Sequence, residues 1–291
     1  MFRVNDFDLL EVLAYTFLWT TLYFILCLWN SVRSYEWHCR IVTTVHALVI
    51  SFLAFYCTFR VGPWPFTDAG GPNSSMQIRI ISLCLGYFLF DVTWCLYFKT
   101  EGPAMMAHHF VSIVGLAWCL FSGYYGTELV ATIGGAEITN PLLQLRWFLR
   151  ETGNYHTLLG TFVDWAFMLS FGFYRIGLGS MLLYSYYQQD TDFWGRLGGT
   201  SIYIISWVFF INIVRYAIRK YAWTSPVSEN NNNKHVLLQA EDSQSESDDC
   251  GVKGQVNTIK DQDIPSQREI KDGGGELSLR NRYIVQESVE I

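Results

Sequence analysis

The chain has 291 residues, of which 51% are hydrophobic, 17% are aromatic and only 16% are charged, with a formal net charge of −6. A soluble globular domain carries about 25% charged residues, so this composition argues against an ordinary soluble enzyme. Nucleic-acid binding is excluded too, because no basic patch appears. Apolar segments fill residues 9 to 220, whereas residues 225 to 291 are polar. We therefore predict a polytopic membrane protein with a polar tail.

Seven apolar segments approach or exceed the roughly 20 residues that span the hydrocarbon of a bilayer. The fifth segment contains Glu137, Asn140 and Pro141, so we expect it to face protein or water rather than lipid. The predicted fold class is all-α, with about seven transmembrane helices and a disordered C-terminal tail. In chain order, the segments are 9–30, 41–60, 78–98, 104–126, 128–148, 157–187 and 198–218.

The basic residues in the loops predict the orientation of the chain. On one side of the predicted spans lie Arg33, Arg40, Lys99, Arg146, Arg150, Arg219 and Lys220, and on the other only Arg3, Arg60, Arg79 and Arg196. The positive-inside rule then places the N-terminus outside or in the lumen and the C-terminus in the cytoplasm. The N-glycosylation sequon at Asn73 falls on the expected outer side. Endoplasmic reticulum and plasma membrane both remain open as locations.

Five ionisable residues from five segments are predicted to lie at a similar depth. They are roughly 9–14 Å below the cytoplasmic boundary, at 1.5 Å per helical residue. Ionisable side chains at such depth cost roughly 2.5 kcal/mol or more unless they are paired or hydrated. We therefore expect one shared polar cavity that opens toward the cytosol. The five residues are His46, Asp91, His109, Glu137 and Asp164.

The adjacent histidines His108 and His109 are the strongest candidates for chemistry. On a helix they point about 100° apart, so one can face the cavity while the other contacts a neighbouring helix. Asp91 or Glu137 could hydrogen-bond one imidazole and raise its basicity, which suits a general base or a nucleophile. A purely packing role remains the alternative. The other residues expected to line the cavity are His46, Tyr87, Trp94, Asn140, Asp164 and Arg175.

A metal site is a third hypothesis for the same residues. Three histidines and two acids could ligate zinc or iron. Adjacent histidines cannot easily aim at one ion from a regular helix, so we expect no metal. The tail beyond residue 220 should be disordered, and the terminal Val289-Glu290-Ile291 could add as a strand to a PDZ-type groove.

Several motifs stand in a characteristic order along residues 35–220. They are Glu36–His46, Gly86–Phe88 with Asp91, His108-His109, Ala136–Pro141, Leu145–Phe148 and Tyr174–Gly177. In this order they resemble the TLC-domain family, named after the translocating-chain-associating, Lag and ceroid-lipofuscinosis proteins. Gly62–Thr67 and Leu149–Gly153 are similar in particular to the small TLC-domain-containing members. The chain then divides into an N-terminal anchor helix at 1–34, a TLC domain at 35–220 and a cytoplasmic tail at 221–291.

The resemblance implies a helical barrel of six family spans plus one more, around a cavity for a lipid or an acyl chain. The family's ceramide synthases transfer an acyl group from acyl-CoA at their paired histidines. That likeness makes His108 and His109 catalytic candidates, with Asp91 or Glu137 as orienting acid and acyl-CoA as cosubstrate. Ceramide synthases carry further acids after the pair, whereas residues 134–140 hold only Glu137. We therefore expect lipid binding and lipid homeostasis without a required cofactor, with acyl transfer as the alternative.

Overall fold

The computed structural model describes residues 9–222, and these form an all-α polytopic membrane protein. The helices are α1 (Leu9–Trp29), α2 (Tyr35–Tyr56), α3 (Ser75–Phe98), α4 (Pro103–Ser122), α5 (Gly126–Glu137), α6 (Asn140–Glu151), α7 (Leu158–Phe171), α8 (Gly179–Gln188) and α9 (Phe193–Ala222). Two π-helical stretches, η1 (Cys57–Val61) and η2 (Gly172–Leu178), extend α2 and join α7 to α8. The chain divides into one unit that ends at Ile213 and a second that begins at Val214. The predictions for the tail and its PDZ-type end concern residues outside the described part.

Six helical stretches are long and apolar enough to cross a membrane, namely 9–29, 35–61, 75–98, 103–122, 158–188 and 193–221. The fifth predicted span is instead two short helices, α5 and α6, which meet at Ile138 and Thr139. Pro141 lies in the first turn of α6, a position where its missing N–H costs least. The α5–α6 pair packs against α2, and α6 also packs against α7. As expected, this segment faces protein.

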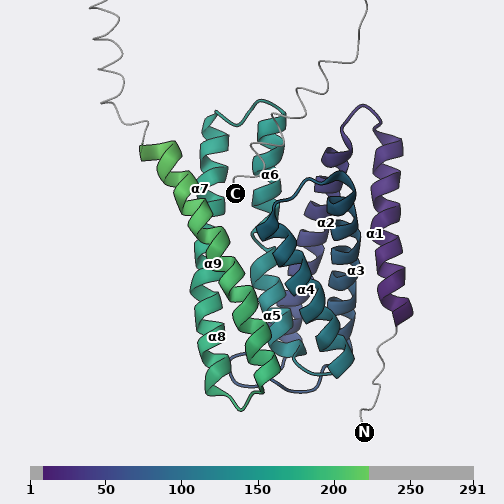
Figure 1. Cartoon of the computed structure of the whole chain (residues 1–291), viewed down its shortest axis with the longest axis vertical. Helices are drawn as coiled ribbons and strands as arrows, with labels where there is room; N and C mark the ends of the chain where they lie inside the picture. The colour runs from purple at the N-terminus through teal and green to yellow at the C-terminus, as the bar shows by residue number, and fades with distance from the viewer. Residues whose placement is uncertain (1–8, 223–291) are drawn as a thin grey trace, which may run out of the picture. The chain divides into compact units, whose positions relative to one another are not determined.

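Within the first unit, α3 lies at the centre of the N-terminal half. It packs against α1, α2 and α4 (Figure 1). The α1–α3 contact needs a glycine, because a Cβ at Gly86 would lie 2.7 Å from the Tyr15 Cβ and 2.9 Å from the Thr16 nitrogen. The apolar core between these helices includes Trp19, Val42 and Ile81. This tightly packed half supports α4 and α5 from one side.

A buried ion pair joins α6 to α7. The Arg146 Nε donates to Asp164 Oδ1 at 2.6 Å, and the Tyr155 hydroxyl donates to Asp164 Oδ2 at 2.6 Å. Both charged side chains are fully enclosed, and the Arg146 guanidinium also lies over the Phe167 ring. Asp164 therefore connects α7 to α6 through its pair with Arg146.

The predicted glycosylation site is also tied into the fold. The Asn73 Nδ2 donates to the Cys119 carbonyl at 2.9 Å, and its Oδ1 accepts from the Gly126 N–H at 2.7 Å. These bonds connect the start of α3 with the turn between α4 and α5. A glycan would attach to this same Nδ2, so modification competes with the folded arrangement. Glycosylation at Asn73 stays a prediction.

Replacing one partner of a buried ion pair leaves the other charge unpaired, which is costly. We predict that Asp164→Asn lowers the free energy of unfolding by about 3 kcal/mol, measured by thermal unfolding in detergent. The matched control is Glu36→Gln, which removes the partly exposed Glu36–Arg40 pair and should cost about 1 kcal/mol or less. Equal destabilisation by the two variants would contradict the structural role of Asp164.

Candidate functional site

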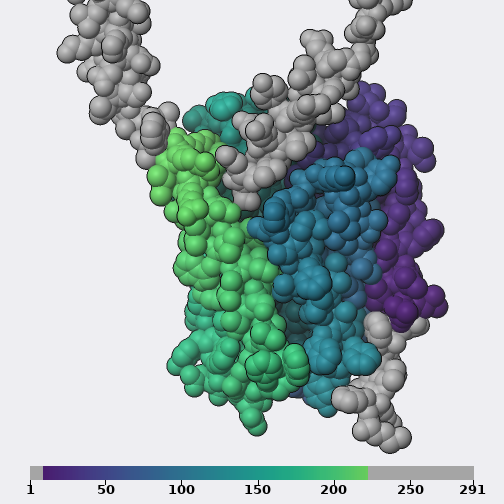
Figure 2. Space-filling view, in the orientation of Figure 1, coloured from purple at the N-terminus to yellow at the C-terminus, as the bar shows by residue number. Residues whose placement is uncertain are grey.

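A cavity of about 280 Å³ lies in the first unit, between α4, α5, α8, α9 and η2. Its wall is mainly apolar, and the segment from Phe55 to Phe66 contributes part of it. Figure 2 shows α4 and α9 next to each other on the visible face of the protein. The polar residues in the wall include His108, Ser112, Glu128, Glu137, Arg175 and Ser206.

Two ring contacts hold α4 against α9. His108 lies against Phe209 at 5.8 Å between ring centroids, and Trp118 lies against Trp194 at 6.0 Å. Between these contacts the cavity wall includes Gly115 and Gly198, and a Cβ added at either would have no neighbour within 4 Å. The cavity wall is therefore open at both glycines.

Three polar residues form one part of the cavity wall, which we call the inner end: His108, Glu137 and Arg175. Arg175 donates through Nη2 to the Ala136 carbonyl at 2.9 Å, while its Nε has no hydrogen-bond partner among the described residues. Glu137 accepts from the Asn140 Nδ2 at 2.7 Å. The Nδ1 of His108 is buried and also lacks a partner within residues 9–222. Among the described residues, the inner end thus presents one unsatisfied donor, the Arg175 Nε–H, and one unsatisfied imidazole nitrogen of His108.

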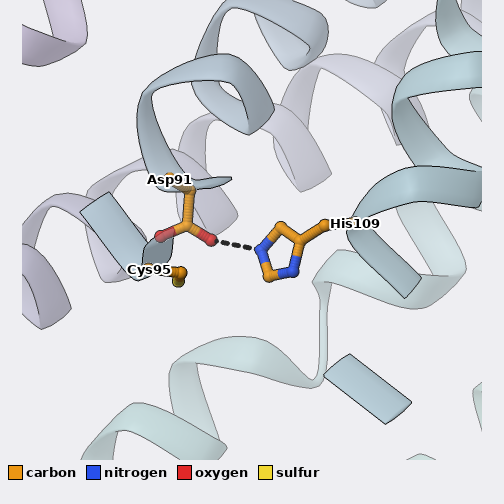
Figure 3. A group of neighbouring side chains, drawn as sticks. All are labelled: Asp91, Cys95 and His109. Carbon is orange, nitrogen blue, oxygen red and sulfur yellow. Dashed lines mark hydrogen bonds and ion pairs between the residues drawn. The ribbon is translucent and has the colours of Figure 1, made fainter. Parts of the chain in front are cut away.

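His109 points away from this cavity and pairs with Asp91. Its Nε2 lies 2.8 Å from Asp91 Oδ2, and its Nδ1 lies 2.9 Å from the Met105 carbonyl (Figure 3). A carbonyl and a carboxylate both accept hydrogen bonds, so both ring nitrogens carry a proton when Asp91 is ionised. The result is an imidazolium–carboxylate ion pair between α3 and α4. The helical spacing correctly predicted that the two histidines point in different directions. It did not predict which of them faces the cavity.

Cys95 completes a small group around this pair. The ligand-type atoms of Asp91, Cys95 and His109 all lie within 4.8 Å of one another (Figure 3). Around a tetrahedral zinc ion, with bonds of about 2.0 to 2.3 Å, such atoms lie only about 3.5 Å apart. The group would have to contract to hold an ion, whereas the ion pair satisfies His109 and Asp91 as they stand. The expectation of no metal remains a prediction.

His46, Tyr87 and Trp94 belong to the apolar core instead of the cavity. His46 is completely buried and stacks on the Tyr87 ring at 3.7 Å between centroids. The Tyr87 hydroxyl donates to Thr43 at 2.9 Å, and the Trp94 Nε1 donates to the Tyr23 hydroxyl at 3.2 Å. All three side chains fix α3 against α1 and α2.

The prediction of one cavity shared by the five ionisable residues is therefore wrong. Asp164 pairs with Arg146, Asp91 pairs with His109, and His46 stacks in the core. Of the five, Glu137 lines the cavity. All five side chains are buried or partly buried in the described structure. The rotation of each helix then turned each side chain toward a different neighbour.

The opposite part of the cavity wall was not anticipated from the sequence. It lies where α4 turns into α5 and α8 turns into α9, and it includes Tyr125, Glu128 and Tyr186. Tyr125, in the α4–α5 turn, donates its hydroxyl to Asp192. Burial, together with this carboxylate, raises the pKa of Tyr125 to about 12. The sequence feature that could have indicated this end of the cavity is Glu128, an acidic residue within an apolar segment.

An all-α polytopic protein with a mainly apolar internal cavity is the class that this fold and site define. Residues 36–227 match the family model of the TLC domain. The chain belongs to the TLC-domain family, whose members are generally membrane proteins of lipid metabolism. The resemblance seen in the sequence motifs is thereby confirmed.

Two curated relatives carry the same domain name. TLC domain-containing protein 4 from Homo sapiens is 28% identical over 211 residues, which cover 68% of this chain and 74% of the relative. TLC domain-containing protein 4 A from Dictyostelium discoideum is 30% identical over 122 residues, which cover 40% of this chain and 46% of the relative. The match with the Dictyostelium protein thus spans about half of that protein's length.

The two adjacent histidines should differ sharply in their effect on stability. His109→Ala removes two hydrogen bonds and leaves Asp91 without its partner, so we predict a loss of about 3 kcal/mol in unfolding free energy. His108→Ala removes a ring that makes no hydrogen bond in the described structure, and we predict a loss of about 1 kcal/mol or less. Thermal unfolding of both variants in the same detergent checks this order, and the reverse order would refute the assignment.

Proposed function

We propose that this protein binds a lipid or an acyl chain in the cavity between α4, α5, α8 and α9, and acts in membrane lipid homeostasis. One observation carries the proposal: a mainly apolar cavity meets unsatisfied polar groups at its inner end. Apolar walls with a few convergent polar groups are typical of sites for small amphiphiles.

The inner end gives a physical reason for a ligand that carries oxygen atoms. A polar group buried without a hydrogen bond costs roughly 1 to 3 kcal/mol. The Arg175 Nε–H requires an acceptor, and neither His108 nor Arg175 has all its polar atoms satisfied by the described residues. The carbonyl or carboxyl oxygen of a lipid would satisfy these groups, while its methylene chain would contact the apolar wall.

Access from the bilayer is consistent with this function. Between the His108–Phe209 and Trp118–Trp194 contacts, α4 and α9 present glycines instead of large side chains. A chain lying in the surrounding lipid can therefore enter sideways without unfolding either helix.

Filling this space should expel the ligand. We predict that Gly115→Leu reduces the lipid that co-purifies with the protein about fivefold or more, because a leucine at this position occupies the chain's volume. Gly198→Leu should act in the same way from α9. Native mass spectrometry after extraction in detergent measures the bound fraction.

Ala14→Leu is the matched control, because it adds a leucine to the exposed face of α1. It should leave bound lipid unchanged. If both glycine variants fold and retain the wild-type amount of lipid, lipid does not occupy this cavity.

Acyl transfer is the second candidate, and the position of His108 favours it. This imidazole lines the cavity and is not held by another side chain's hydrogen bond. In such a reaction a ring nitrogen attacks the thioester carbonyl of acyl-CoA, the C–S bond breaks, and CoA leaves as the thiol with the proton from the other ring nitrogen. An amine or hydroxyl acceptor then takes the acyl group, and its proton passes to the ring. The paired acid at Asp91 serves His109 instead, so His108 lacks the orienting carboxylate that a strong general base needs.

Formation of a covalent adduct distinguishes acyl transfer from lipid binding. Incubation with palmitoyl-CoA should leave the protein mass unchanged if it is a lipid binder. A mass increase of one palmitoyl group that disappears in His108→Ala, and persists in the exposed control His156→Ala, would instead establish an acyltransferase.

We further infer an N-terminus outside or in the lumen and a C-terminus in the cytoplasm, in the endoplasmic reticulum or the plasma membrane. The distribution of loop arginines and lysines supports this orientation. Labelling of a cysteine introduced at Lys99 by a membrane-impermeant reagent tests it. Protection in intact cells and reaction after permeabilisation are expected, and reaction in intact cells would reverse the topology.

A further inference from the structure

The second end of the cavity, where α8 turns into α9, is walled by large aromatic rings. Trp118, Tyr125, Tyr186 and Trp194 all line it, and the Trp118 and Trp194 rings lie 6.0 Å apart between centroids at an angle of 51°. These four side chains come from α4, the α4–α5 turn, α8 and α9. The fold therefore gathers rings from four separate segments around one part of the cavity.

Two carboxylates lie among these rings. Glu128 accepts a hydrogen bond from the Gly70 N–H at 3.1 Å through Oε2, whereas its Oε1 is buried and has no hydrogen-bond partner in residues 9–222. Asp192 accepts from the Tyr125 hydroxyl and from the Gly195 N–H. Within the described part of the chain, no lysine, arginine or histidine forms an ion pair with either carboxylate.

The arginine nearest in sequence is engaged elsewhere. Arg196 donates to the Thr191 hydroxyl at 3.0 Å and to the Gln189 carbonyl at 3.1 Å. Its guanidinium also lies over the Tyr187 ring. Among the described residues, Glu128 in the cavity wall therefore has no cationic partner.

The groups converge at Gly195. A Cβ added there would collide with the Tyr186 hydroxyl, and would lie 3.0 Å from the Tyr125 ring and 3.1 Å from Asp192 Oδ1. Tyr186 is only 3% exposed, and its hydroxyl lies beside the Glu128 carboxylate. The Tyr186 hydroxyl and the Glu128 carboxylate thus lie next to each other in the cavity wall, where a ligand in the cavity can contact both.

We propose that this end of the cavity, formed by Trp118, Tyr125, Glu128, Tyr186 and Trp194, binds the ammonium headgroup of a lipid. Aromatic rings around a carboxylate are the chemistry that recognises a choline-type cation, because each ring face attracts positive charge. The inference rests on the proposed lipid-binding function and adds the class of headgroup.

The spacing along α5 fits such a ligand. Glu128 and Glu137 are nine residues apart on this helix, which corresponds to roughly 13 Å. An ammonium group at Glu128 therefore leaves the ester oxygens of the same lipid within reach of the inner end, where Arg175 lacks an acceptor for its Nε–H. The two ends have opposite electrostatic preferences, so a headgroup with only negative charge is disfavoured at the Glu128 end.

The test compares three probes with the same sixteen-carbon chain: lysophosphatidylcholine, lysophosphatidic acid and palmitate. Binding to the purified full-length protein is measured by native mass spectrometry in one detergent. We expect lysophosphatidylcholine to bind about tenfold more tightly than lysophosphatidic acid. Glu128→Gln should weaken the binding of lysophosphatidylcholine about fivefold or more and leave the binding of palmitate unchanged. Retained palmitate binding also shows that the variant folds. Trp194→Leu should weaken the binding of lysophosphatidylcholine to a similar extent.

The matched control is Glu151→Gln, which neutralises an exposed carboxylate at the end of α6 and should bind all three probes like the wild type. Equal affinity for lysophosphatidylcholine and lysophosphatidic acid overturns the headgroup inference and leaves lipid binding intact. An unchanged affinity of Glu128→Gln for lysophosphatidylcholine overturns it as well. Failure of the wild type to bind any of the three overturns both the inference and the proposed function.

Discussion

A bilayer offers no water to polar side chains, so each ionisable group inside the helical bundle needs a partner within the protein or in a ligand. Two ion pairs meet this demand. Arg146 with Asp164 joins α6 to α7, and His109 with Asp91 joins α3 to α4. Since either pair breaks if one of its helices rotates, the His109–Asp91 pair fixes α4, which borders the cavity, and the Arg146–Asp164 pair fixes α6 against α7. The rest of the structure depends on this pairing.

Some of the buried polar atoms that have no hydrogen-bond partner among the described residues lie along the cavity, whereas others, such as those of His46 and Ser82, lie elsewhere. His108 and Arg175 are at the inner end, and Glu128 with Tyr186 is near the α8–α9 turn. A protein that merely packed its helices would have little reason to keep such groups at this depth, since their burial is costly. An amphiphile that carries oxygen atoms and a cationic headgroup satisfies both ends together. In the proposed lipid the phosphate and glycerol would lie between the two ends, and the acyl chain would contact the rest of the apolar wall.

The family's paired histidines acquire separate roles in this chain. His109 is held by Asp91 and by the Met105 carbonyl, so it acts as a helix-to-helix connection. His108 faces the cavity without an orienting carboxylate. A base that nothing orients is better suited to ligand contact than to proton transfer, which is why lipid binding is the primary proposal and acyl transfer the alternative.

Much of the fold could be predicted from the sequence, because apolar length and family motifs mark each helix independently of its neighbours. Asn140 and Pro141 likewise indicated that the fifth segment faces protein or water, but not that the helix divides there into α5 and α6. The partners of the polar residues could not be predicted, because depth does not determine how each helix rotates. His46 illustrates this limit: it is buried inside the protein, yet it stacks on Tyr87 in the core instead of lining the cavity. The Glu128 end was missed because its groups meet only through turns far apart in sequence.

The most direct measurement is an electron cryomicroscopy map of the protein in lipid nanodiscs, at a resolution that shows acyl chains. The account predicts elongated density that runs along the space between α4 and α9, with one end beside Arg175 and the other among Trp118, Tyr186 and Trp194. A cavity closed by α9 packing directly onto α4 and α5, with no density inside it, would contradict the account.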